Sequence, residues 1–181
     1  MSGPLIERIH AAAAANPAAP AFIFQDRILT YAQFLSLIRA TARLLHDRGV
    51  RPGDTVGLSM GRWPMHCVAF LALARLGALS LPLPRNLTPE AGRALAARFG
   101  VSTVVSNWQD APVPPGARLL LLDSMSLDDA AVELDLGGYQ PDGSTPLRVA
   151  LTSGTTGARR GVIHTHASFA QRVDLTALDC D

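Results

Sequence analysis

The residues best suited to chemistry stand together in one short segment, 152–161. This segment reads TSGTTGARRG, with four hydroxyl side chains and three glycines. Glycine lets backbone amides approach an anion closely, and hydroxyl groups add donors for phosphate oxygens. The two arginines add charge-assisted contacts to the same oxygens, so the segment predicts a phosphate-binding loop. The residues expected to bind phosphate are Thr152, Ser153, Gly154, Thr155, Thr156, Gly157, Arg160 and Gly161.

Two other phosphate-binding motifs do not fit this segment. A Walker loop needs a second glycine five residues after the first, but Arg159 stands five residues after Gly154. A dinucleotide-binding turn needs Gly-x-Gly, but Thr156 stands two residues after Gly154. A flexible Ser/Thr/Gly linker is the plain alternative. The apolar runs 149–151 and 162–163 are typical of strands on both sides, and they favour the loop.

Strands and helices alternate along the chain before this loop. Strands joined by helices of ten or more residues form right-handed crossovers. We therefore expect an α/β fold, a mainly parallel sheet with helices on both faces. The expected strands are 22–24 and 28–29 as a hairpin, then 55–59, 78–81, 103–105, 119–122 and 147–151. The expected helices are one that ends near 16–17 and three more within 30–49, 64–76 and 88–100.

Local signals sharpen this prediction at several points. Thr30 and Gln33 have the spacing of a capping box, in which each side chain accepts a hydrogen bond from the other residue's backbone. Thr88 stands directly before a proline, which is typical of a helix start. We expect 119–122, four consecutive leucines, to be a buried strand. Residues 123–146 predict a surface connection, with one short helix around 128–134.

The loop and its surroundings resemble a known family. The run 151–161 resembles the signature Thr-Ser-Gly-Thr-Thr-Gly-x-Pro-Lys-Gly of adenylate-forming enzymes, and 165–166 resembles the Thr-His that often follows it. This superfamily comprises acyl-CoA synthetases, peptide-synthetase adenylation domains and luciferases. Upstream, 29–31 (LTY), 49–56 (GVRPGDTV) and 71–84 (LALARLGALSLPLP) resemble its earlier motifs in the same order. The resemblance thus covers nearly the whole chain.

The resemblance implies a reaction in which ATP and a carboxylate give an acyl-adenylate and pyrophosphate. Mg²⁺ usually accompanies the ATP, and a thioester with coenzyme A or a carrier phosphopantetheine commonly follows. In that family the loop corresponding to 152–161 holds the ATP phosphates. The pair 155–156 is closer to the acyl-CoA synthetase branch, with its role in fatty acid metabolism, than to peptide synthetases. The expected function is the N-terminal part of a carboxylate-activating ligase of the acyl-CoA synthetase type.

The chain also departs from the family pattern. Arg159 and Arg160 replace the signature's Pro-Lys, and all sixteen basic residues are arginine, so the chain has no lysine. The family's later motifs, including a C-terminal domain with its catalytic lysine, have no counterpart here. We therefore expect residues 1–181 to be a partial N-terminal AMP-binding domain, inactive alone, and we predict no catalytic residue. Two alternatives stay open: a silent fragment or non-enzymatic module that binds nucleotide or protein, and a fragment of an amino-acid-activating domain.

The composition excludes some of the remaining classes of function. The chain has 181 residues, is 48% hydrophobic and carries a net charge of +1. A chain of this size buries roughly 70% of its unfolded surface, enough for one domain with a core. Its arginines are scattered among acids without a basic stripe, which excludes a nucleic-acid partner. The absence of lysine excludes a Schiff base on lysine.

Location and association follow from similar arguments. The apolar stretch 67–83 is interrupted by Arg75, Gly77 and Pro82, so we expect no membrane span. Two cysteines without a targeting pattern indicate the cytoplasm. No metal site is predicted. We also expect self-association, because a sheet that is cut short exposes a strand edge and apolar surface.

Overall fold

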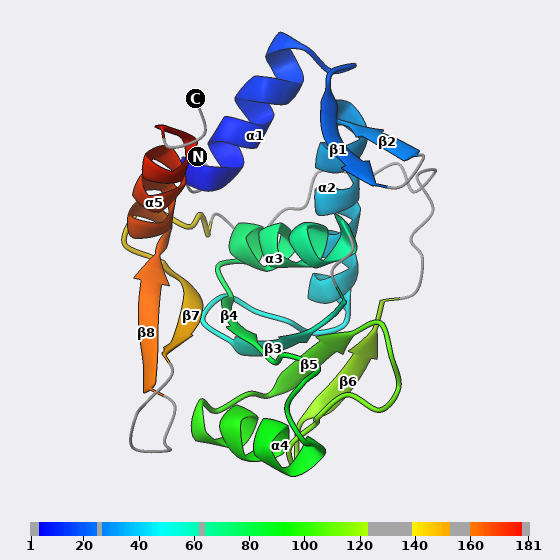
Figure 1. Cartoon of the computed structure of the whole chain (residues 1–181), viewed down its shortest axis with the longest axis vertical. Helices are drawn as coiled ribbons and strands as arrows, with labels where there is room; N and C mark the ends of the chain where they lie inside the picture. Colours follow the sequence, from blue (N-terminus) through cyan, green and yellow to red (C-terminus); the bar gives the residue numbers. More distant parts are fainter. Residues whose placement is uncertain (1–3, 25–26, 62–63, 123–138, 153–159, 179–181) are drawn as a thin grey trace.

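The computed structural model has a six-stranded sheet at its centre (Figure 1). The structure describes residues 4–24, 27–61, 64–122, 139–152 and 160–178. The strands of this sheet are β3 (Thr55–Ser59), β4 (Leu79–Pro82), β5 (Thr103–Ser106), β6 (Arg118–Leu121), β7 (Pro146–Thr152) and β8 (Arg160–Thr165). Their order is β6-β5-β3-β4-β7-β8, with every neighbouring pair parallel except β7 and β8. The predicted mainly parallel sheet is confirmed.

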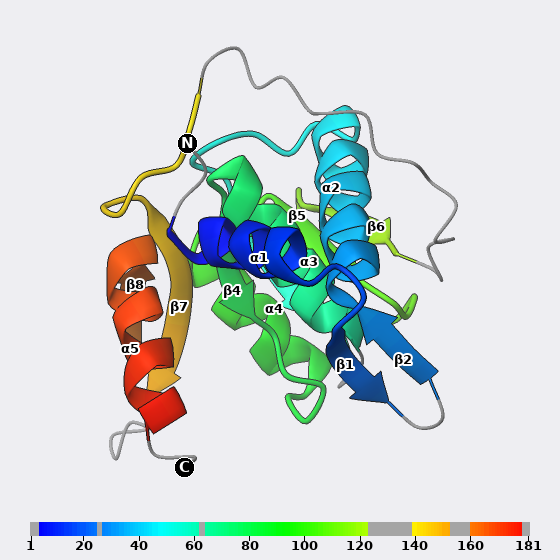
Figure 2. The same ribbon diagram turned by 90° about the horizontal axis from the view of Figure 1, so that it is seen from above.

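Helices cover both faces of the sheet, as expected. They are α1 (Pro4–Ala15), α2 (Tyr31–Asp47), α3 (Pro64–Leu76), α4 (Pro89–Arg98) and α5 (His166–Leu178). In Figure 1, α4 lies below the sheet, and the other four helices lie above it. Figure 2 shows α1 lying across α3, between α5 on one side and α2 on the other. No helix among the described residues is both long enough and apolar enough to cross a membrane.

Each face of the sheet has its own apolar core. The larger core joins α1, α2 and α3 to the sheet, and it includes the fully buried Ile38, Leu45 and Leu73. The smaller core lies under α4, where Leu95 packs with Val149 of β7. Burial of these side chains supplies most of the driving force for folding, at about 25 cal/mol per Å² of apolar surface. The second core reaches β7, the strand that leads into the predicted loop.

The helix-start signals read from the sequence are present in the structure. The Gln33 backbone amide donates to the Thr30 hydroxyl at 3.3 Å, and the Thr30 amide donates to the Gln33 side chain at 3.0 Å. Thr88 caps α4 by accepting from the Ala91 amide at 3.2 Å. These caps satisfy amides that would otherwise lack a partner at a helix start. They explain why α2 and α4 begin where the sequence predicted.

One strand differs from its prediction. The run 119–122 was expected to be a buried strand, but β6 is the outermost strand of the sheet on its side. Leu121 is 40% exposed, while Leu120 and Leu122 are buried. Successive side chains of a strand point to opposite faces, and an edge strand is covered less completely than a central one. The helix predicted around 128–134 lies outside the described residues.

A hairpin of β1 (Pro20–Phe24) and β2 (Arg27–Thr30) projects beside the main body (Figure 1). Its inner face is held by Phe22, whose ring meets that of Phe34 edge-on at 4.9 Å. Ile23 and Ile28 are register partners on the exposed face. The antiparallel pairing confirms the predicted hairpin.

The connections after β3 and β4 leave the sheet in opposite directions. The chain passes from β3 to α3 above the sheet, and from β4 to α4 below it (Figure 1). β3 and β4 are parallel neighbours, so a crevice opens between their carboxyl ends. In open α/β sheets, ligands bind at such crossover points.

Candidate functional site

The antiparallel ladder of β7 and β8 carries the predicted phosphate-binding loop. Thr152 at the end of β7 is the register partner of Arg160 at the start of β8, and Leu151 pairs with Gly161. The two ends of the predicted loop therefore lie side by side at one place in the sheet. The sequence predicted one strand before the loop and one after it, which favoured a loop over a flexible linker. Both strands, β7 and β8, are present.

β7 is tied to the parallel part of the sheet beside β4. Ser80 of β4 pairs with Arg148 of β7, and the Ser80 hydroxyl donates to the Leu147 carbonyl at 3.0 Å. Ser80 and Leu147 are both buried. Because β3, β4 and β7 run parallel, Thr152 emerges at the sheet edge where the crevice between β3 and β4 opens.

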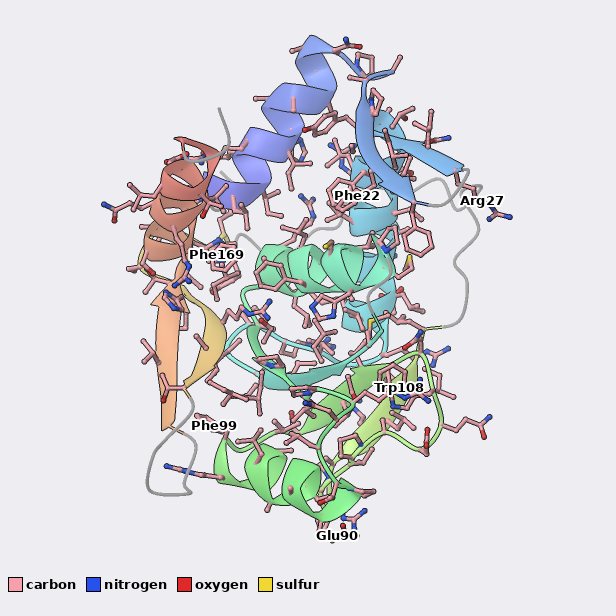
Figure 3. All side chains as sticks on the ribbon, in the orientation of Figure 1. Phe22, Arg27, Glu90, Phe99, Trp108 and Phe169 are labelled. Carbon is pink, nitrogen blue, oxygen red and sulfur yellow. The ribbon has the colours of Figure 1, made fainter. Side chains whose placement is uncertain are left out.

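Gly161 allows β8 to approach α4 closely. A Cβ atom on Gly161 would lie 2.5 Å from Cζ of Phe99 and 2.7 Å from Cγ1 of Val149, closer than real side chains come. Figure 3 shows Phe99 at the end of α4, next to the start of β8. The packing against Phe99 and Val149 therefore requires a glycine at position 161. Its predicted phosphate contact stays a prediction.

The centre of the predicted loop lies outside the described residues. This applies to Ser153, Gly154, Thr155, Thr156 and Gly157. The structure brings together the loop's ends, Thr152, Arg160 and Gly161, and Thr152 is exposed. All eight residues remain predicted phosphate contacts.

Helix α5 follows β8 directly, and its start is capped by Thr165, the last residue of β8, together with Ser168. The Ser168 amide donates to the Thr165 hydroxyl at 3.3 Å, and the Thr165 amide donates to the Ser168 hydroxyl at 2.9 Å. His166 is fully buried, and neither of its ring nitrogens has a hydrogen-bond partner among the described residues. Burial lowers the pKa of His166, and nearby Asp142 opposes this shift in part. His166 is therefore a packed, neutral side chain.

The turn around Asp142 holds this helix start in place. Asp142 accepts from the Ser144 hydroxyl at 2.7 Å and from the Thr145 amide at 3.0 Å. These donors, led by the Ser144 hydroxyl, lower the pKa of Asp142. The His166 amide in turn donates to the Thr145 carbonyl at 3.0 Å. Among the described residues, no three His, Cys, Asp or Glu side chains gather to hold a metal ion.

Sequence reasoning missed one charged side chain near this site, Arg148. It is half-buried in β7, and its guanidinium lies 5.3 Å from the centre of the Phe70 ring. Burial lowers the pKa of Arg148. A single arginine between Leu147 and Val149, inside an apolar strand, was the signal that could have identified it.

Comparisons with known proteins show the family to which this chain is similar. The family described as AMP-binding enzyme matches residues 9–180. The chain is 31% identical over 157 residues to the long-chain-fatty-acid–CoA ligase FadD13 of Mycobacterium tuberculosis, covering 79% of this chain and 31% of that protein. It is 30% identical over 153 residues to bacitracin synthase 1 of Bacillus licheniformis, covering 82% of this chain and 3% of that protein.

A solved structure shares the fold. The nonribosomal peptide synthetase FmoA3, in an AMPPNP-bound form, has a TM-score of 0.79 and 26% identity, covering 94% of this chain and 18% of that one. This chain therefore spans less than a third of FadD13 and a much smaller share of the two peptide synthetases.

Proposed function

The chain belongs to the AMP-binding enzyme family, and from this premise we propose that residues 152–161 hold the phosphates of ATP in a ligase that activates a carboxylate as its adenylate. The observation that carries the proposal is the β7–β8 ladder. It joins Thr152 to Arg160 at the end of a strand that is anchored in the sheet. A phosphate loop needs such a rigid base, because donors held in place before the reaction stabilise charge without reorganising.

The residues of the segment fit the phosphates of ATP by their chemistry. Ser153, Thr155 and Thr156 supply hydroxyl donors, and Gly154 and Gly157 leave backbone amides open to an anion. Negative charge accumulates on the departing pyrophosphate when the carboxylate attacks the α-phosphorus, and donors aimed at that charge favour the reaction. Mg²⁺, when bound with ATP, would neutralise part of the same charge.

Arg160 takes the position of the signature's lysine and supplies a cation to the same phosphates. A guanidinium is planar and binds two oxygens side by side, whereas an ammonium is a compact point charge. Arg160 therefore suits a bidentate contact to a phosphate. We expect Arg160→Lys to weaken MgATP binding rather than to improve it, although it restores the family's residue.

These 181 residues supply phosphate binding and lack a lysine for catalysis. We propose that they are a partial N-terminal AMP-binding domain and that adenylate formation requires groups outside them. The alternative is a non-enzymatic module that binds nucleotide or protein. An exchange assay with labelled pyrophosphate, MgATP and a panel of carboxylates measures this directly. We expect nucleotide binding without exchange, and clear exchange by this polypeptide would contradict the proposal.

We propose an acyl-CoA synthetase type of ligase, with coenzyme A or a carrier phosphopantetheine as acceptor. The pair Thr155-Thr156 supports this assignment. An amino-acid-activating domain is the second candidate, and the similarity to bacitracin synthase 1 favours it. Titration of fatty and aryl carboxylates against amino acids, each with MgAMPCPP present, separates the two, because the methylene group between the α- and β-phosphorus atoms of AMPCPP prevents adenylate formation. Tighter binding of amino acids would favour the second candidate.

A nucleotide series tests the proposed function itself. We expect calorimetry to show binding of MgATP and magnesium pyrophosphate, with AMP at least about tenfold weaker, because AMP lacks the phosphates that the loop would hold. Equal affinity for AMP and MgATP would place the contacts elsewhere on the nucleotide. No binding of MgATP would contradict the proposal.

A further inference from the structure

A cavity of about 370 Å³ lies between helices α1 and α2, where the end of α1 comes next to α2 (Figure 2). Its wall includes Ala13 and Ala14 of α1 and Ala32 of α2, whose short side chains leave the space open. The Ala32 amide donates to the carbonyl of Pro17, just after α1, at 3.0 Å, so the backbone holds the two helices together here. Small-molecule sites have volumes of roughly 300–1,000 Å³. The α1–α2 cavity is therefore large enough for a small ligand.

The polar side chains of the α1–α2 cavity are His10, Ser36 and Arg39. Ser36 and Arg39 are three residues apart on α2, so their side chains lie on the same face of the helix. Arg39 is half-buried, and its Nη2 atom is 3.4 Å from Nδ1 of His10. The guanidinium is the donor in this long hydrogen bond, because an arginine side chain has no acceptor. The contact joins the two helices and directs the guanidinium along the cavity wall.

Arg39 carries a charge that no acid neutralises within the described part of the chain. Arg43, one turn further along α2, donates to Asp47 at 3.1 Å. Arg8 of α1 pairs with Asp174 in the same way. Arg39 has no such ion pair, and its Nε atom is buried without a hydrogen-bond partner among the described residues. A half-buried guanidinium with an unused donor has a strong preference for a charged acceptor.

The acids of these two helices lie away from the cavity. The sequences of α1 and α2 hold two acids, Glu7 and Asp47. Asp47 already accepts from Arg43, and Glu7 is exposed. Neither is among the lining residues, and none of the described lining residues is acidic. The cavity is therefore electropositive, which favours an anion as its ligand.

We propose that the α1–α2 cavity binds a tetrahedral oxyanion, as inorganic phosphate or as the phosphate group of a small monoester, on Arg39 and Ser36. The guanidinium supplies charge-assisted donors, and the Ser36 hydroxyl supplies one more from a separate point on α2. The oxygens of a phosphate point in several directions and can accept from both residues, whereas the two oxygens of a carboxylate lie in one plane.

This site is distinct from the two other places where a ligand could bind. It contains no residue of the loop 152–161, and it shares none of its described lining residues with the larger cavity, of about 890 Å³, beside Arg148. The proposal therefore does not rest on the proposed function, and each can fail without the other.

Nitrogen-15 NMR titrations of the 181-residue protein at constant ionic strength test the proposal. The probes are sodium phosphate, glycerol 3-phosphate and sodium acetate. With both phosphates, we expect the Ser36 and Arg39 amide signals and the Arg39 side-chain Nε–H signal to shift and reach saturation. Acetate should bind at least about tenfold more weakly, and the tighter of the two phosphates identifies the ion or the ester as the ligand. Shifts that never saturate with either phosphate, or acetate that binds as tightly, would overturn the proposal.

Substitutions locate the bound phosphate. Arg39→Met keeps an apolar stem and should weaken phosphate binding at least about tenfold. Arg43→Met is the matched control, because it removes an exposed arginine of the same helix, and the affinity should stay unchanged. The double variant Thr155→Val with Thr156→Val should also keep this affinity, which separates the cavity from the predicted loop. The Arg39 side-chain signal of the unmodified protein reports the same contact without a substitution. Phosphate binding that is unchanged in Arg39→Met would overturn the proposal.

Discussion

Gly161 of β8 lies so close to the ring of Phe99 that no further carbon atom fits between them. This contact presses the first residues of β8 against the end of α4 and joins the predicted loop to the smaller core. The loop's last residue is thus fixed by packing on one side and by the β7 ladder on the other. The same small residue serves close packing and, by prediction, close approach to an anion.

Gly161→Ala should lower the free energy of unfolding by about 1–3 kcal/mol, because the new methyl group would overlap Phe99 and Val149. Urea denaturation measures the change. The matched control is Gly61→Ala, where the nearest atom to a new Cβ is 4.0 Å away. Gly161→Ala as stable as the unmodified protein would contradict the packing described here.

Ser80→Ala should cost about 1 kcal/mol of stability, since it removes the buried hydroxyl that donates to the Leu147 carbonyl. The loss should also loosen β7 against β4, and faster hydrogen exchange at the β7 amides would report it. Ser102→Ala, at an exposed serine, is the control. Exchange in β7 that stays unchanged would show that the hydroxyl does not hold this strand.

Acid should destabilise the protein through His166. Burial lowers its pKa below the ordinary value of 6.5, so the folded state binds fewer protons than the unfolded state. The free energy of unfolding should therefore fall as the pH drops below about 6.5, by up to about 1.4 kcal/mol per pH unit for each such histidine. His66, whose pKa burial also lowers, contributes in the same direction.

Urea titrations from pH 7.5 down to about pH 5 measure this dependence, which lies in the range where a histidine of ordinary pKa takes up its proton. His166→Met should reduce the slope of the free energy of unfolding against pH. The part of the slope that is due to His66 should remain. The same slope in both proteins, or stability that increases on acidification, would contradict a neutral buried His166.

Much of the fold could be predicted because its signals are local. Helix α3 has the bounds that the sequence suggested, and Thr30 and Gln33 form the expected capping box. The order of strands in the sheet is set by contacts between distant residues, which no local pattern encodes. For this reason the leucines of β6 were expected to be buried, although that strand lies at an edge.

The candidate site likewise has one part that the sequence predicts and another that only the structure shows. The loop 152–161 could be identified from residue types, since Gly, Ser, Thr and Arg in close succession suit phosphate. The closeness of Gly161 to Phe99, and the position of Arg148 beside a cavity, depend on how β7, β8 and α4 pack. Such relations between separate elements appear only in three dimensions.

The exposed edge of β8 should promote self-association. Val162 and Ile163 are 50% and 54% exposed on this outermost strand. An uncovered strand edge with apolar side chains can pair with a second copy of the chain. Sedimentation velocity should show a coefficient that rises with concentration, and Ile163→Lys should reduce the rise. A monomer at every concentration would contradict this prediction.

The most direct test of the central claim is a calorimetric titration of MgATP into the unmodified protein and into the double variant Thr155→Val with Thr156→Val. Both substitutions keep the shape of the side chain and remove its hydroxyl donor. We predict affinity at least about tenfold weaker in the double variant, since donors to phosphate are lost. Thr176→Val, on the exposed face of α5, should bind as the unmodified protein does. Identical isotherms for the double variant and the unmodified protein would contradict the assignment of the loop.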